Sequence, residues 1–529
     1  MSNTHDIEQD GQITVSGSQS KTHRITVPSG ESATFRGRVT DKWGRTSSWS
    51  DPVTATSQSE STVQTLGLHV TAQELVIWRD RWDNGVPGDS FLNTRVDEER
   101  ARLTNHSNTV ANDIGGHLWF IPSMNTDSQG RYSSQPSPSM STARNQAGRL
   151  LNAAFTALVT QNAARMNQIG SILHQQPDQT RCQFADDPGW AYGVAQMRDA
   201  SVPGFEVSHA VIQHLHTYTY HQSAVQEGWA NDLTSAQHTK IRNWYRSWAD
   251  YNLDGMEVRL DQAFNDGWTS GDYSSFRTNV CTFCGSGVVY DGGPTVYTLH
   301  DRFNNRFART VAAVGLTGLL LDDAHLKERA WRATRDALIY AFWPQGAITD
   351  NQRASMSASE RWQQAYIILN LSHILPMVDA FARAGDPSLY QFTTTQGELG
   401  TAGAPSNTTG NTESEKSFLF AIRAVARYGN RTYDRYAVGE RIDFRGPFQV
   451  NSVGKDNLGA HDAWIYANLY YQDMGLPRDW YRGEGGQPTW VIHGNGTTDL
   501  NDAWSFPAPY LMWAGLEGQV WPYPGVPQP

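Results

Sequence analysis

Residues 297–321, with the sequence YTLHDRFNNRFARTVAAVGLTGLLL, constrain the fold more than any other stretch of this chain. The apolar residues Phe303, Phe307, Val311 and Val314 recur three or four positions apart, which predicts a helix with one buried face. Alanine and glycine residues lie between them, and such small side chains let a second helix pack close. We therefore expect a fold in which helices pack against helices.

The other face of this segment is polar and cationic. Arg302, Asn305, Arg306 and Arg309 also recur at helical spacing. An amide flanked by guanidinium groups suits a substrate carboxylate, because charge-assisted and bidentate hydrogen bonds to carboxylates are strong. The alternative is the solvated face of an ordinary helix, and this segment alone does not decide between the two.

The overall charge is acidic. The 529 residues include 42 Lys and Arg against 53 Asp and Glu, a net charge of −11. General nucleic-acid binding requires the opposite balance, so we expect no nucleic-acid partner. A polyanionic substrate would need a locally basic cleft on this acidic protein.

Cysteine usage does not predict a metal site. Cys281 and Cys284 form a CTFC pair, and Cys182 stands alone. A structural zinc usually has four ligands, so we expect no metal, and we expect no cofactor. A local disulfide or a simple loop pair remains as the interpretation of CTFC.

The first residues, MSNTHDIEQDGQITV, have neither the basic nor the apolar region of a secretory signal peptide. No apolar run approaches the length of a membrane span, so we expect a soluble protein with no membrane association. The cytoplasm, export by another route and carriage on a virion all fit the sequence.

Three regions differ in pattern. Residues 1–60 alternate apolar and polar residues with Gly, Pro and Ser between the runs, which predicts short strands. Within them, GRVTDKWGRTSSWSDPVTATS resembles the last strands of a fibronectin type III module. Residues 61–485 show helical periodicity in successive segments, and residues 486–529 form an irregular C-terminal extension rich in Gly, Pro and Trp. We expect a mainly α fold, an (α/α) toroid of helical hairpins with a small N-terminal β-appendage.

The segment FEVSHAVIQHLHTYTYHQSA, which begins at residue 205, predicts a helix with several histidines. His209, Gln213, His216 and Tyr220 share one edge of it. These side chains either line a cavity or are ordinary hydrogen-bonded core residues.

A helix is predicted over residues 357–384, ending at the stop signal Gly385-Asp386-Pro387. One face is apolar, and the other carries a hydrogen-bonding stripe of Trp362, Gln363, Tyr366, Asn370 and His373. A tyrosine among amide and imidazole groups, beside an Arg-rich helix, is a candidate acid and base, because nearby cations favour the phenolate. The alternative is a tyrosine whose hydroxyl completes a buried polar network.

Two segments together, NNRFARTVAAVGLTGLLLDDAHLKERA and ERWQQAYIILNLSHILPMVDAFARAGDPSLYQF, resemble the core of the α/α-toroid alginate lyases. Asn304-Asn305 matches that family's amide pair, Tyr366 falls on its catalytic tyrosine, and residues 386–390 match the end of its helix. Two positions differ. Arg306 follows the amide pair where the family has His, and Ser359 stands where the family has Arg.

The resemblance implies a polysaccharide lyase that cleaves a polyuronic acid, such as mannuronan, alginate or glucuronan, by β-elimination. Tyr366 would then be the base and acid, with Asn305 and Arg306 neutralising the carboxylate, and an anionic polysaccharide would be the partner, met outside the cell or on a virion. The further candidates for substrate binding are Arg361, Arg353, Arg302, Arg309, Gln363, Asn370, His373, His300, His209 and Trp190. The alternatives are a glycoside hydrolase on the same toroid, which needs two suitably spaced carboxylates, and a non-catalytic polysaccharide-binding or virion protein. The polymer, endo or exo action and the oligomeric state are left open.

Overall fold

The computed structural model describes residues 4–18, 32–40, 45–56, 65–110, 138–179, 203–265, 303, 305–342, 361–394, 416–419, 421–422, 461–471, 506–516 and 519–526. These residues belong to two compact units, Met1–Gln64 and Thr65–Pro529. Each unit is described by itself.

The N-terminal unit contains one antiparallel sheet. Its strands are β1 (Thr4–Gln9), β2 (Gln12–Ser18), β3 (Ser32–Thr40) and β4 (Val53–Thr56), in the order β2-β1-β3-β4. The turn between β1 and β2 places Asp10 and Gly11 at positive φ, 49° and 85°, which glycine adopts readily. Arginines of β3 pair with acids of β1, Arg36 with Glu8 and Arg38 with Asp6. The predicted small N-terminal sheet is therefore present.

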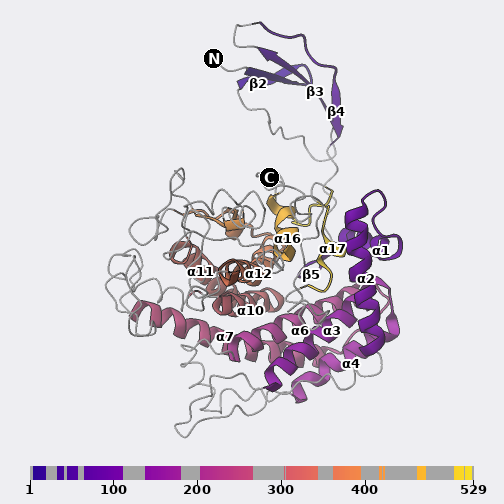
Figure 1. Ribbon diagram of the computed structural model, residues 1–529, viewed down its shortest axis with the longest axis vertical. Helices are drawn as coiled ribbons and strands as arrows, with labels where there is room; N and C mark the ends of the chain where they lie inside the picture. Colours follow the sequence, from indigo (N-terminus) through magenta and orange to yellow (C-terminus); the bar gives the residue numbers. More distant parts are fainter. Residues whose placement is uncertain are drawn as a thin grey trace. The chain divides into compact units, whose positions relative to one another are not determined.

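The second unit is mainly helical, as predicted (Figure 1). Two short strands, β5 (Thr65–Gly67) and β6 (Val70–Thr71), precede its helices. The helices are α1 (Ala72–Asn84), α2 (Ser90–Val110), α3 (Pro138–Val159), α4 (Ala163–Gln179), α6 (Pro203–Gln226), α7 (Ser235–Asn265), α10 (Asn305–Leu321), α11 (Ala324–Tyr340), α12 (Arg361–Arg383), α13 (Ser388–Gln391), α16 (His461–Tyr471) and α17 (Pro509–Met512).

Successive helices alternate between two layers. Helices α3, α6, α10 and α12 pack side by side in that order and form a middle layer, whereas α4, α7 and α11 form an outer layer in the same order. On the side of the middle layer away from α4 and α7 lie β5, α16 and α17 (Figure 1). The middle layer is thus enclosed between two sets of elements.

The middle-layer helices are buried on nearly all sides. Every residue of α6 from Ser208 to His221 is buried, and in α10 only Arg306 is less than buried between Asn305 and Gly318. Two glycines of α10 permit this packing. A Cβ on Gly315 would lie 2.2 Å from Sδ of Met377 on α12, and one on Gly318 would lie 2.8 Å from the backbone nitrogen of Lys327 on α11. The expectation that small residues admit close helix packing is confirmed.

The described starts of α10 and α12 lie later in the chain than the predicted starts. α10 begins at Asn305, and residues 297–302 and 304 lie outside the described part. α12 begins at Arg361, and the expected start at residue 357 lies outside it too. The predicted stop is present, because α12 ends at Arg383 and Gly385 follows with a φ of 92°.

Residues 506–516, in the expected C-terminal extension, pack into the helical unit. Phe506 and Trp513 belong to its buried core. The Glu99 carboxylate of α2 accepts hydrogen bonds from the backbone nitrogens of Tyr510 and Leu511 at 3.2 and 2.8 Å, and so satisfies amides near the start of α17.

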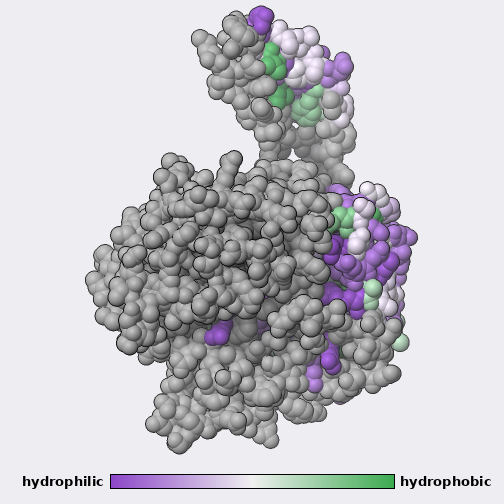
Figure 2. All heavy atoms as spheres, in the orientation of Figure 1, coloured by the Kyte–Doolittle hydropathy of each residue, from purple (hydrophilic) through white to green (hydrophobic). Residues whose placement is uncertain are grey.

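The described surface of α1 and α2 is largely polar (Figure 2). On the face drawn in Figure 2, α1 and α2 present mostly hydrophilic residues. Among the described helices none is both long enough and apolar enough to cross a membrane.

Candidate functional site

The first turn of α10 lies against the polar face of α12. The Asn370 side chain of α12 donates a hydrogen bond from Nδ2 to the backbone oxygen of Phe303, at 3.2 Å. Asn305, the first residue of α10, is 5% exposed, and the next residue, Arg306, is half-buried. The structure therefore places Asn370 of α12 beside the start of α10, where Asn305 and Arg306 lie.

Arg309 lies one turn further along α10, and it is among the largest fully buried side chains of the described residues. Its charge acts on both neighbouring helices, because it contributes to lowering the pKa of His216 on α6 and of His373 on α12. The face of α10 that carries Asn305 and Arg309 is thus an interior face and not a solvated one. In this arrangement Arg309 can influence a ligand through its electric field but not through an exposed guanidinium.

Two predicted binding residues meet between α6 and α12. The His209 and His373 rings pack edge to face with their centroids 5.2 Å apart, and both side chains are almost fully buried. Burial, and then the charge of Arg309, holds the pKa of His373 well below its usual range. His373 is accordingly a neutral imidazole at physiological pH.

A second histidine pair extends this group. The rings of His69 and His216 lie 5.0 Å apart, and Nε2 of His69 donates to the backbone oxygen of Pro376 at 2.8 Å. Burial, followed by the charge of Arg383, lowers the pKa of His69 to about 3. For His216 the causes are burial and then the charges of His69 and Arg309, and its pKa is also well below the usual range. We call His69, His209, His216, Arg309 and His373 the buried His–Arg cluster.

Other predicted residues are placed only by their position in the chain. Arg361, Gln363 and Tyr366 lie in the first two turns of α12, and their side chains lie outside what the structure describes. Positions 366, 370 and 373 share one face of a helix because it repeats every 3.6 residues. Tyr366 therefore belongs to the stripe whose next member, Asn370, contacts the start of α10. The remaining candidates outside the described residues are Arg353, Arg302, His300 and Trp190.

A buried ionic network lies in the same unit. The Glu74 carboxylate of α1 accepts hydrogen bonds from Nη1 and Nη2 of Arg383 at 2.8 and 2.9 Å, and Nε of Arg383 donates to Asp379 at 2.6 Å. Both acids are fully buried. Sequence reasoning missed this network. One signal for it was present, because Thr71-Ala-Gln-Glu74 is a capping-box pattern, and the structure forms that capping box at the start of α1.

These acids do not resemble a hydrolytic pair. Glu74 and Asp379 both face Arg383, so their oxygens are occupied by donors and neither is exposed to a substrate. Within the part of the chain that the structure describes, no three His, Cys, Asp or Glu side chains are grouped closely enough to hold a metal ion.

The chemical character of the predicted site follows from these contacts. The Asn370 amide of α12 contacts the chain just before α10 begins, and the buried guanidinium of Arg309 lies one turn further along α10. Such a place favours an anion, because helix N-termini and a buried cation both stabilise negative charge. Searches against protein-family models, curated proteins and solved structures find no match to this chain.

Proposed function

We propose that this chain is a polysaccharide lyase that cleaves a polyuronic acid by β-elimination. The observation that carries the proposal is the hydrogen bond from Asn370 to the backbone oxygen of Phe303. It brings the first turn of α10, with its amide and guanidinium groups, against the α12 face that contains position 366. The residues expected to neutralise a carboxylate and the residue expected to move a proton thus belong to adjoining helix faces.

The fold supports the same proposal. Each of the hairpins α3–α4, α6–α7 and α10–α11 has one helix in the middle layer and the next in the outer layer. We propose that this two-layered array closes into an (α/α) toroid whose inner helices are those of the middle layer. The end of the middle layer at which α10 begins would then face the polymer.

In the proposed reaction the C5 proton of a uronate leaves, the C4–O glycosidic bond breaks, and a C4=C5 double bond forms. Negative charge moves into the carboxylate as the proton leaves, and preorganised donors on Asn305 and Arg306 would stabilise it. The Tyr366 phenolate would take the proton and return it to the leaving oxygen.

Arg309 has a supporting role in this proposal. Its buried charge already lowers the pKa of a side chain on α12. The same field would favour the phenolate form of a tyrosine two turns before that side chain, because a nearby cation lowers a phenol's pKa. Arg309 would therefore tune the base and not touch the sugar.

The test is incubation of the full chain with mannuronan, guluronan, glucuronan and polygalacturonate. Elimination creates a double bond conjugated with the carboxylate, so ultraviolet absorbance should rise in step with new reducing ends for at least one polymer. New reducing ends without new absorbance would mean hydrolysis. Saturable polymer binding without any product would mean a non-catalytic binding protein.

A further inference from the structure

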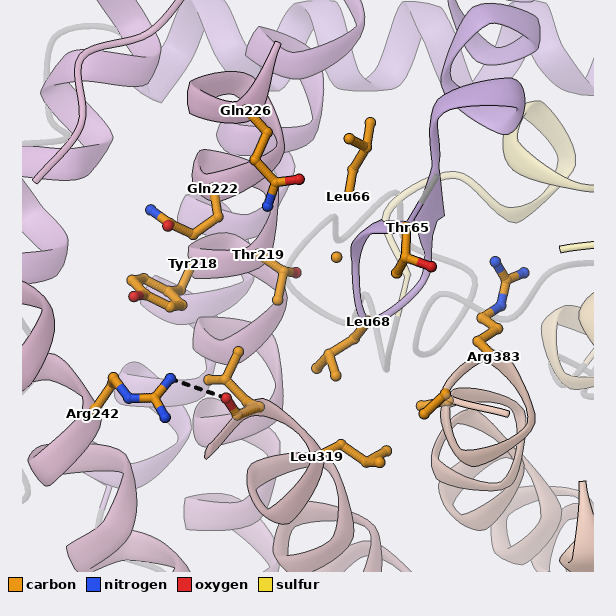
Figure 3. Close-up of a pocket in the computed structure, with 14 residues that line it drawn as sticks. Thr65, Leu66, Leu68, Tyr218, Thr219, Gln222, Gln226, Arg242, Leu319 and Arg383 are labelled. Atoms are coloured by element: carbon orange, nitrogen blue, oxygen red, sulfur yellow. Dashed lines mark hydrogen bonds between the residues drawn. The ribbon is translucent and has the colours of Figure 1, made fainter. Parts of the chain in front are cut away.

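A cavity of about 350 Å³ lies at the opposite end of the middle layer from the proposed catalytic residues (Figure 3). Its walls come from the last turns of α6, α10 and α12, from β5 and from the first turns of α7. Leu319 of its wall is 14 residues after Asn305 on α10, which is about 21 Å along the helix axis at 1.5 Å per residue. The cavity is therefore separate from the proposed catalytic end.

The two arginines of this cavity are directed at acceptors of the protein. Arg242 of α7 donates from both terminal nitrogens to the backbone oxygens of Leu320 and Leu321, each at 3.1 Å, and so caps the C-terminus of α10. All three donor nitrogens of Arg383 bind Glu74 or Asp379. Both guanidinium groups are therefore engaged by acceptors of the protein, Arg242 by backbone carbonyls and Arg383 by carboxylates.

Uncommitted hydrogen-bonding groups come from α6. Gln222 and Gln226 are one turn apart on it, and both line the cavity. The Gln226 side chain has no hydrogen-bond partner among the described residues, while Gln222 uses only its amide nitrogen, toward His221. In Figure 3, Thr219 and Gln226 lie across from Leu66 and Leu68. The glutamine amides thus stand on the wall formed by α6, and the wall across from it provides apolar surface from Leu66 and Leu68 together with the hydroxyl of Thr65.

The aromatic member of the wall is also neutral. Tyr218 bonds through its hydroxyl to Nδ1 of His238 at 2.7 Å, and burial raises the pKa of Tyr218 to about 12. Its ring and the side chains of Leu68 and Leu319 provide apolar surface beside the two amides.

We propose that this cavity binds an uncharged sugar ring. Each glutamine amide has both a donor and an acceptor, which suits the hydroxyl groups of a pyranose, and the apolar wall suits its C–H face. The volume lies near the lower limit for small-molecule sites, which fits one or two sugar rings. A uronate or an amino sugar binds more weakly, because its charged group loses hydration in the cavity and meets no charged side chain that is free of hydrogen bonds to the protein. This inference does not depend on the proposed function.

The test is calorimetric titration of the full chain with glucose, mannose and galactose, and with glucuronate and glucosamine as charged counterparts. At least one neutral sugar should bind saturably, and the matching charged sugars should bind more weakly. The double variant Gln222→Leu/Gln226→Leu should weaken that binding about tenfold or more, the effect of one or two lost hydrogen bonds. Gln73→Leu, at an exposed position of α1, is the matched control and should change nothing.

A second variant fills the cavity without changing its polar groups. Ala384 is exposed and belongs to the cavity wall, so Ala384→Trp should block sugar binding while leaving the melting temperature near that of the parent. Binding that persists in both variants would place the sugar elsewhere and overturn the proposal. Tighter binding of glucuronate than of any neutral sugar, or no saturable binding of any neutral sugar, would overturn it as well.

Discussion

Glu74 and Arg383 form a bidentate ion pair, with bonds of 2.8 and 2.9 Å, between residues 309 positions apart in the chain. The pair joins the first turn of α1 to the last turn of α12. Trp513 also donates to Glu74, at 2.9 Å, and Tyr523 donates to Asp379 at 2.6 Å. The C-terminal segment that contains Trp513 and Tyr523 is therefore hydrogen-bonded to the same network.

The first prediction is that Arg383→Met destabilises the helical unit by about 3–5 kcal/mol, the usual effect of removing one partner from a buried ion pair. Although burial opposes it, the carboxylates of Glu74 and Asp379 hold the pKa of Arg383 well above its usual range. Without the guanidinium, two buried acids are left without their cation. Urea unfolding followed by tryptophan fluorescence measures the change.

The matched control is Arg332→Met. Arg332 pairs with Glu328 on the surface of α11, where both side chains are more than half exposed, and exposed pairs contribute about 0–1 kcal/mol. If Arg383→Met loses no more stability than this control, the buried network does not stabilise the helical unit.

The second prediction concerns acid. His69 has a native pKa of about 3 against 6.5 in the unfolded chain, so below pH 6.5 the unfolded state binds a proton that the native state does not. The free energy of unfolding then falls as the pH falls from 6.5 toward 3, by up to about 1.4 kcal/mol per pH unit for each such histidine. Burial also lowers the pKa of His216 and of His373, so these two residues change the stability in the same direction.

His216→Phe tests this sign. His216 packs against Phe506 with ring centroids 5.1 Å apart, and its ring nitrogens have no hydrogen-bond partner among the described residues. A phenyl ring there keeps the packing and removes the proton-binding group. The stability of the variant relative to the parent should therefore increase as the pH falls below 6.5. His325→Phe, at an exposed position, is the control, and a parallel pH dependence of parent and His216→Phe would contradict the prediction.

The helical architecture could be predicted from local pattern, because helix periodicity and stop signals act over a few residues. The segment 357–384 illustrates this, since its stop at Gly385 is present in the structure. The spacing of four residues also predicted correctly that Asn305 and Arg309 share one face of a helix.

Which side chains are buried could not be predicted from local sequence spacing. The stripe on α10 looked as compatible with solvent as with a site, and only packing against α6 and α12 encloses Arg309. His69 and Glu74 were missed because their partners lie hundreds of positions away, and no local pattern contains both members of such a pair.

The third prediction is that residues 1–64 are dispensable for turnover. They form a compact unit of their own, whereas the helical unit begins at Thr65, and no candidate catalytic residue lies among them. A chain beginning at Thr65 should keep the melting temperature of the helical unit and its turnover on soluble polymer. A truncated chain that folds but has no activity would contradict this.

The fourth prediction is that Tyr366→Phe lowers turnover by about a hundredfold or more, the usual contribution of a positioned proton carrier. Polymer binding and the melting temperature should change little, because only a hydroxyl is removed. Tyr218→Phe, at the other end of the middle layer, is the control and should keep near-parental turnover. Near-parental turnover in Tyr366→Phe as well would make Tyr366 a packing residue.

The last prediction concerns which uronate is cleaved. In mannuronate and glucuronate the C5 proton and the C4 oxygen lie on the same side of the ring, so one group can serve as base and then as acid. In guluronate they lie on opposite sides, and a second group must act as base. Arg306 stands where the resembled family has a histidine, and a guanidinium stays protonated in proteins.

Two histidines that the structure describes near this end, His209 and His373, do not replace that base, and His300 lies outside the described residues. His209 and His373 are buried against each other, and the low pKa of His373 makes it a poor proton acceptor. With Tyr366 as the one base, elimination should be faster on mannuronate blocks and glucuronan than on guluronate blocks, as initial rates of absorbance change will show. Arg306→His should raise the rate on guluronate blocks relative to mannuronate blocks. Faster elimination on guluronate by the parent chain would reveal a second base and contradict the one-base mechanism.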